Sequence, residues 1–85
     1  MAGKYIPLEN YLASLLVSQR EVTMNFYQIE RILNAKLPAS AHQYQAWWRN
    51  QKEGTHVEAQ AWLDAGWKSD TVNFTSKWVR IRPAV

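Results

Sequence analysis

Apolar residues recur at steps of three and four along three segments of the chain, and this spacing predicts three helices. The first segment covers residues 7–18, begins at Pro7 and carries Leu8, Leu12 and Leu15 on one face. Proline fits the first turn of a helix, because the amide hydrogen that it lacks would have no partner there. The second segment covers residues 26–34 and the third covers residues 55–65. Each helix is expected to bury its apolar face in a core.

Capping signals mark where these helical segments begin and end. A capping box, in which a polar residue is followed three positions later by Glu or Gln, occurs at Asn25–Gln28, Ser40–Gln43 and Thr55–Glu58. Asn34 and Gly66 follow the second and third helices, and both residue types adopt the left-handed conformation that ends a helix. We therefore expect helices to begin at Asn25 and Thr55, and a short helical turn to begin at Ser40.

After Gly66 the period of the apolar residues changes to two. Val72 and Phe74 alternate with polar residues, and so do Val79 and Ile81. This pattern predicts a β-hairpin that turns near residues 75–76 and closes at Pro83. Residues 21–24 are interpreted as a further short strand or an extended link.

Residues 44–49 allow two interpretations. Tyr44 and Trp48 share one face whether the segment is helical or extended. In a strand, Gln45, Trp47 and Arg49 would occupy the opposite face. Because aromatic residues favour pleated surfaces, we predict a strand over residues 44–49. The two adjacent tryptophans would then lie on opposite faces, one in the core and the other on the surface.

Together these elements predict an α+β fold that forms a single domain over residues 1–85. Three helices and a helical turn would pack with a small antiparallel sheet, which consists of the carboxy-terminal hairpin and one further strand. The order of elements resembles a winged helix with an extra helix inserted. Fold class alone does not determine function.

The composition narrows the classes of protein to which the chain can belong. The chain has 85 residues, of which 47% are hydrophobic, and its five tryptophans argue against disorder. There is no cysteine, so thiol chemistry and disulfides are excluded. The longest apolar run, residues 11–17, is far shorter than the roughly 18–20 residues that span a bilayer. We expect no membrane association and no export signal, and therefore a cytoplasmic location.

Positive charge is concentrated in two parts of the chain, although the net charge is only +3. Residues 31–52 contain four Lys or Arg residues and no carboxylate, and residues 71–85 contain three more without a carboxylate. A clustered positive surface attracts nucleic-acid phosphates through counterion release.

Both basic segments place tryptophan beside arginine, which favours nucleic-acid binding because the indole stacks on bases and the guanidinium binds phosphates. If Val79 and Ile81 face the core, the neighbouring side chains on that strand line the opposite face. The candidate binding residues are Gln45, Trp47, Arg49, Asn50, Lys52 and His56 in one group, and Lys77, Trp78, Arg80 and Arg82 in the other. The alternative is that each arginine covers a tryptophan of the same molecule as a cation–π pair.

No combination of residues predicts an enzyme, a metal site or a cofactor. His42 and His56 are the only histidines, and a zinc site would need two more ligands that cysteine does not supply here. Ser40 is better explained as a helix cap than as a nucleophile. The carboxylates form no close pair, and no glycine-rich phosphate loop is present.

Four stretches of the chain, "KYIPLENYL", "FYQIERIL", "LPASAHQYQAWWRN" and "AWLDAGW", resemble a small bacterial domain family of unknown function with the pattern LPxSA…WWxN…AWLxAGW. Members of that family occur alone or fused to restriction-endonuclease-like and other DNA-processing regions. The resemblance implies a setting in DNA processing or phage defence, and it assigns no binding residues.

We therefore expect a non-enzymatic nucleic-acid-binding module, with DNA as the first candidate. The alternative is a protein-interaction module, such as a phage or host-defence inhibitor or an accessory subunit, that uses an exposed tryptophan as its anchor. The sequence leaves the oligomeric state open.

Overall fold

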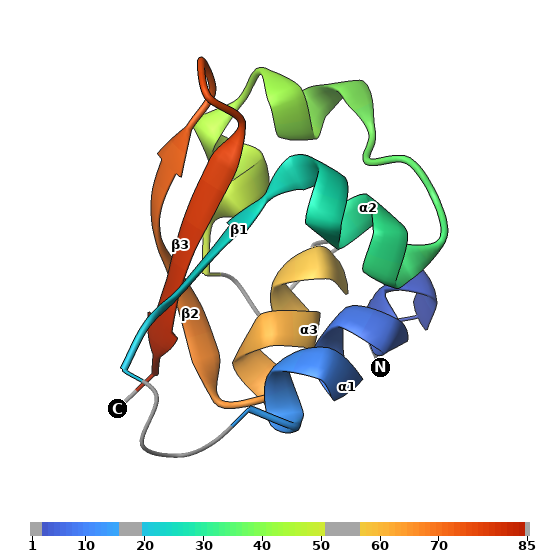
Figure 1. Cartoon of the computed structure of the whole chain (residues 1–85), viewed down its shortest axis with the longest axis vertical. Coiled ribbons are helices and arrows are strands. Elements are labelled where there is room, and N and C mark those ends of the chain that lie inside the picture. Colours follow the sequence, from blue (N-terminus) through green and yellow to red (C-terminus); the bar gives the residue numbers. More distant parts are fainter. Residues whose placement is uncertain (1–2, 16–19, 51–56, 85) are drawn as a thin grey trace.

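The computed structural model describes residues 3–15, 20–50 and 57–84, in which the helices pack on one face of an antiparallel sheet (Figure 1). The elements are, in chain order, the 3-10 helix η1 (Gly3–Tyr5), α1 (Ile6–Ala13), β1 (Val22–Asn25), α2 (Phe26–Leu33), the 3-10 helices η2 (Ala39–His42) and η3 (Gln45–Trp48), α3 (Val57–Asp64), β2 (Trp67–Asn73) and β3 (Trp78–Pro83). The predicted α+β class is confirmed. In the described part of the chain, no helix is long and apolar enough to span a membrane.

The sheet has the order β1-β3-β2, so β3 is its central strand. Both neighbours run antiparallel to β3, with Met24 of β1 and Val72 of β2 on either side of Val79. Met24, Val79 and Ile81 are buried against the helices. The predicted hairpin, its closure at Pro83 and the short strand after residue 21 are confirmed.

The capping box at the start of α2 is present in full. The side chain of Asn25 accepts a hydrogen bond from the Gln28 amide (2.7 Å), and the Gln28 side chain accepts one from the Asn25 amide (2.9 Å). At the other end, Asn34 adopts the left-handed conformation with φ 55°. This helix therefore begins and ends where its local signals predicted.

The other two helices end earlier than predicted, α1 at Ala13 and α3 at Asp64. α1 ends at Ala13, well before residue 18, and the hydroxyl of Ser14 donates to the Tyr11 carbonyl (2.6 Å). Serine competes in this way for backbone groups that would otherwise continue a helix. α3 ends before Gly66, whose φ of 90° matches the predicted helix end. The cap expected at Thr55, and residues 16–19, lie outside the described residues.

The predicted strand over residues 44–49 is wrong, and so is the predicted cap at Ser40. Two 3-10 helices occupy this region, and neither has a side-chain cap. In a 3-10 helix neighbouring side chains point about 120° apart, so both tryptophans can contact the same core, which a strand does not allow. The indole N–H of Trp48 donates to the Ala41 carbonyl (2.9 Å) and fixes this arrangement.

An aromatic stack forms the centre of the core. The Trp48 ring lies between Phe26 (5.2 Å between centroids) and Trp62 (5.9 Å), nearly parallel to both. Trp47 is half-buried and meets the Trp48 ring edge-on at 4.7 Å. The predicted separation of the two tryptophans, one into the core and the other onto the surface, is therefore wrong.

Candidate nucleic-acid interface

The outer face of the sheet is polar and is not covered by the described helices, which lie on its other side (Figure 1). Because side chains alternate along a strand, the burial of Val79 and Ile81 places Trp78, Arg80 and Arg82 on the outer face of the central strand. Residues paired directly with these three share their face. They are Thr23 and Asn25 on β1, and Lys68, Thr71 and Asn73 on β2. The structure confirms the predicted orientation of this row.

Each arginine of the outer face already has a carboxylate partner. Arg80 Nε lies 3.4 Å from Glu21 Oε2, and Arg82 Nε lies 3.3 Å from Asp70 Oδ2. The Arg82 guanidinium also reaches Glu21 at 3.9 Å. With Lys68, this face carries three positive and two negative side chains, a net charge of +1.

Trp78 is half-buried, and the Arg80 guanidinium lies 5.5 Å from the centre of its indole ring. The cation–π pair considered as an alternative in the sequence is therefore present. Such a pair at an exposed site is worth about 0.5–1 kcal/mol, so it does not lock the indole away from a ligand.

Lys77 precedes this row in the turn of the hairpin, where it adopts φ 58°. Its carbonyl accepts a hydrogen bond from the Phe26 amide (2.9 Å), which joins the hairpin turn to the start of α2. The left-handed conformation costs a residue with a side chain about 1 kcal/mol or more, and glycine or asparagine usually occupies it.

The other predicted group is not brought together as a binding row. Gln45 and Arg49 are exposed, but Trp47 packs edge-on against Tyr5 at 6.1 Å. The side chain of Asn50 is used inside the protein. Its Oδ1 accepts hydrogen bonds from the Trp62 indole (2.9 Å) and the Ser69 amide (2.8 Å), and its Nδ2 donates to the Ser69 carbonyl (3.0 Å).

Asn50 therefore has a structural role, and the asparagine that follows "WWR" in the motif is explained by the core. Lys52 and His56, which complete this group, lie outside the described residues.

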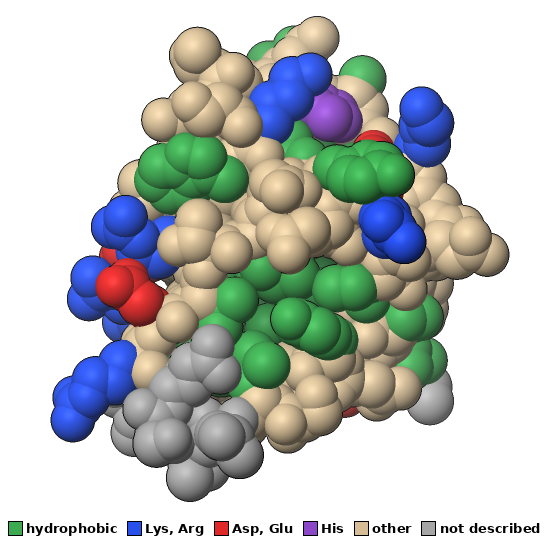
Figure 2. Space-filling model, viewed as in Figure 1, with side chains coloured by type: hydrophobic (Ala, Val, Ile, Leu, Met, Phe, Trp, Pro, Cys, Tyr) green, Lys and Arg blue, Asp and Glu red, His purple; other side chains and the backbone are tan. Residues whose placement is uncertain are grey.

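The sequence did not predict a pocket of about 560 Å³ that lies beside the hairpin turn. Figure 2 shows Lys and Arg side chains in two places on the visible face, one among carboxylates along the edge of the sheet and one around a histidine near the hairpin end. His42 lines the pocket together with Lys36 and Lys77. The only sequence signal for this group was the absence of carboxylates over residues 31–52.

A family model for a domain of unknown function, DUF7662, matches residues 5–84, which include every element from α1 to β3. The chain belongs to the DUF7662 family. The predicted resemblance to a small domain family of unknown function is thereby confirmed, whereas its fusion partners stay a prediction. No curated protein and no solved structure matches the chain at a significant level.

The likeness of this DUF7662 domain to a winged helix stays a prediction. The composition of α3 argues against its use as a recognition helix in the major groove. In helix-turn-helix proteins the second helix of the motif enters the major groove and contacts the bases. α3 has the sequence VEAQAWLD, without a single Lys or Arg and with carboxylates at Glu58 and Asp64. Four of its residues, including Trp62, are buried. The outer face of the sheet is therefore a better candidate for contact with DNA than α3.

Proposed function

We propose that this DUF7662 domain is a non-enzymatic nucleic-acid-binding module that contacts DNA with the outer face of its sheet. The observation that carries the proposal is the row of Trp78, Arg80 and Arg82 on the central strand of that uncovered face. Arginine binds phosphate with two parallel hydrogen bonds, and tryptophan offers a ring on which a base or sugar can stack.

The ion pairs on this face do not prevent binding. The side chains of Arg80 and Arg82 are 36% and 50% exposed, and those of Glu21 and Asp70 are 49% and 35% exposed. Pairs this accessible to water contribute about 0–1 kcal/mol, so a phosphate can displace the carboxylate at small cost. Binding is then an exchange of one anion for another, and its affinity should be modest and sensitive to salt.

Fluorescence anisotropy with labelled duplex and single-stranded DNA, over a series of about 50–200 mM salt, tests this proposal. Arg80→Gln and Arg82→Gln should each weaken binding for every DNA sequence and should lower the slope of log K against log salt by about 0.7–0.9. Lys4→Gln, an exposed change of equal charge in η1, is the matched control and should have little effect.

Glu21→Gln provides a test in the opposite direction, because it removes the carboxylate that both arginines contact. It should raise DNA affinity severalfold. No binding at about 50 mM salt, or equal losses from Lys4→Gln and Arg80→Gln, contradicts the proposal.

A bacterial setting in phage defence or restriction, and a cytoplasmic location, belong to this proposal and are supported by the family resemblance and the absence of cysteine. Expression of the domain in bacteria that are then challenged with phage would test the defence setting. Arg80→Gln is the variant that should lose protection.

A second candidate function, binding of a protein partner, is favoured by two exposed tyrosines. Tyr27 and Tyr44 are 65% and 59% exposed, and the Arg31 guanidinium lies 5.7 Å from the centre of the Tyr27 ring. Tyrosine and arginine are enriched where proteins bind one another. Isolation of a protein partner that Tyr27→Ala releases, with no DNA binding in the anisotropy series, would favour this function over the first.

A further inference from the structure

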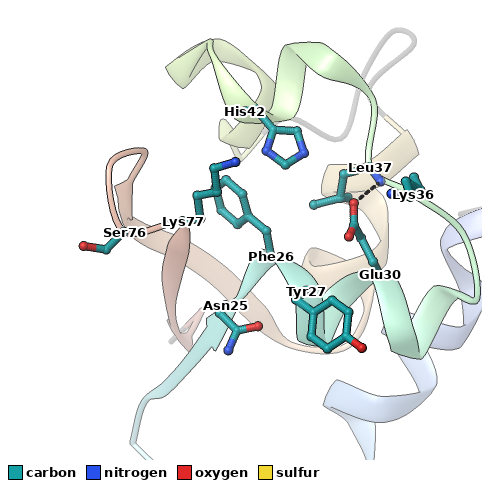
Figure 3. A pocket seen from close by; sticks show the side chains of 9 residues that line it. All are labelled: Asn25, Phe26, Tyr27, Glu30, Lys36, Leu37, His42, Ser76 and Lys77. Atoms are coloured by element: carbon teal, nitrogen blue, oxygen red, sulfur yellow. Dashed lines mark hydrogen bonds between the residues drawn. The ribbon is translucent and has the colours of Figure 1, made fainter.

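The pocket beside the hairpin turn is formed by segments that are far apart in the sequence (Figure 3). Asn25, Phe26 and Tyr27 come from the junction of β1 and α2, His42 comes from η2, and Lys77 comes from the turn between β2 and β3. Its volume of about 560 Å³ lies in the range of sites that hold small organic ligands.

The charged side chains around the pocket leave it positive. Lys36 and Lys77 both line it, and in the part of the chain that the structure describes neither forms an ion pair. Glu30, the carboxylate of the lining, already accepts a hydrogen bond from the Leu37 amide at 2.9 Å. The pocket therefore differs from the outer face of the sheet, where each arginine is matched by a carboxylate.

His42 adds a polar group whose hydrogen bonding is incomplete. Its Nδ1 is buried, and among the described residues it is the side-chain atom that is buried without a hydrogen-bond partner. The imidazole meets the Phe26 ring edge-on at 5.3 Å, and Figure 3 shows the Lys77 side chain extending toward it. A ligand in this pocket could supply the hydrogen-bond partner that the imidazole lacks within the protein.

The conformation of Lys77 also indicates a role for its side chain. Glycine or asparagine would fit φ 58° with less strain, yet lysine stands there and extends into the lining. Strain that a more suitable residue would remove is a reason to look for function in the side chain that remains.

We propose that this pocket binds a phosphorylated small molecule with a planar ring, such as a nucleoside monophosphate. The phosphate lies between Lys77 and His42, where the ammonium group and an imidazole N–H donate to its oxygens. The ring lies against the exposed ring of Tyr27, and the Glu30 carboxylate accepts a hydrogen bond from an amino group of the ligand ring. This site is separate from the proposed contact with DNA, which uses the outer face of the sheet.

Titration of the full chain with AMP, GMP and inorganic phosphate, followed by amide chemical shifts in NMR, tests the proposal. The nucleotides should bind with a Kd at or below about 1 mM, and inorganic phosphate should bind about tenfold more weakly, because it has no ring to pack on the aromatic wall. The shifts should centre on Phe26, Leu37 and His42. No saturable shift with either nucleotide would overturn the proposal, and so would equal affinity for phosphate and nucleotide.

Lys77→Gly separates a binding role from a structural one. Because glycine relieves the left-handed conformation, the melting temperature should be unchanged or raised, whereas nucleotide affinity should fall about tenfold. Lys68→Gln, a change of equal charge on the outer face, is the control and should leave nucleotide affinity unchanged. Nucleotide affinity that Lys77→Gly preserves would overturn the assignment of the phosphate position.

The two proposals can fail separately. Arg80→Gln should weaken DNA binding and leave nucleotide binding in the pocket unchanged. Loss of nucleotide binding in that variant would show that nucleotides bind the outer face, and would therefore overturn the pocket while leaving the proposed function in place.

Discussion

Replacement of Asn50 by alanine should destabilise this domain far more than is usual for an exposed residue. The change removes the hydrogen bonds that the Asn50 side chain makes with Trp62 and Ser69, and it leaves the indole N–H of Trp62, a residue that is 1% exposed, without a protein partner. A buried donor without a partner costs about 1–3 kcal/mol, and each partly solvated bond to the Ser69 backbone contributes about 0.5 kcal/mol. The expected loss in the free energy of unfolding is therefore about 2–4 kcal/mol.

That loss is a large fraction of the roughly 5–15 kcal/mol that holds a small domain together. At about 4–8 °C per kcal/mol for a domain of this size, the melting temperature should fall by at least about 8 °C. Urea denaturation followed by tryptophan fluorescence, together with thermal circular dichroism, measures both quantities.

Two further variants should be measured beside Asn50→Ala for comparison. Arg49→Ala changes the exposed neighbour and should cost less than about 0.5 kcal/mol. Asn50→Asp keeps an oxygen that can accept from Trp62 and from the Ser69 amide, and loses only the donor, so it should cost less than Asn50→Ala. If Asn50→Ala costs no more than Arg49→Ala, the structural role assigned to Asn50 is refuted, and the asparagine returns to the list of candidate binding residues.

Three further predictions concern the rest of the fold. Burial raises the pKa of the Tyr5 hydroxyl above its usual value of 10.0, and the negative charge of Glu58 raises it further. The free energy of unfolding should therefore be unaffected by this group below about pH 10 and should fall above it. Urea titrations at about pH 8 and pH 11 should show a smaller fall for Tyr5→Phe than for the unchanged protein. Asn25→Ala removes the capping box of α2 and should cost about 1 kcal/mol in the same titrations. Trp67→Phe removes the indole bond to the Leu12 carbonyl (3.0 Å) that joins β2 to α1, and the unpaired buried carbonyl should lower the free energy of unfolding by about 1–3 kcal/mol.

The parts of the fold that the sequence predicted correctly are those controlled by neighbouring residues. The caps at Asn25 and Asn34 act within one helical turn, and Gly66 can adopt its positive φ whatever packs around it. The alternation over β3 was equally informative, because a period of two fixes which side chains share a face.

The strand prediction over residues 44–49 failed because tertiary contacts outweighed local preference. Aromatic residues favour strands mainly by packing on a pleated surface, and Trp48 packs instead between Phe26 and Trp62. Both partners are distant in the sequence. No pattern within the segment could have shown that its two tryptophans would turn toward one core.

The sequence predicted which side chains lie on the outer face of the sheet, but it did not predict the net charge of that face. The sequence placed Arg80 and Arg82 on the outer face, but their partners, Glu21 and Asp70, lie on other segments and meet them only in the folded sheet. The sequence did not indicate the pocket, because its walls come from three parts of the chain that carry no shared motif.

The positions of the carboxylates determine whether an anionic ligand must displace a paired carboxylate, both on the outer face of the sheet and in the pocket. On the outer face, Glu21 contacts both guanidinium groups, so under the proposed function DNA would have to displace a carboxylate that is already paired with them. In the proposed pocket site, a phosphate would not have to displace a carboxylate from Lys77, because no ion pair of Lys77 is present in the described part of the chain. Glu21→Gln should therefore raise the affinity for DNA and leave the affinity for a nucleotide unchanged. An equal rise in both affinities would show that Glu21 acts on any anion through long-range charge, and that neither surface is a site of its own.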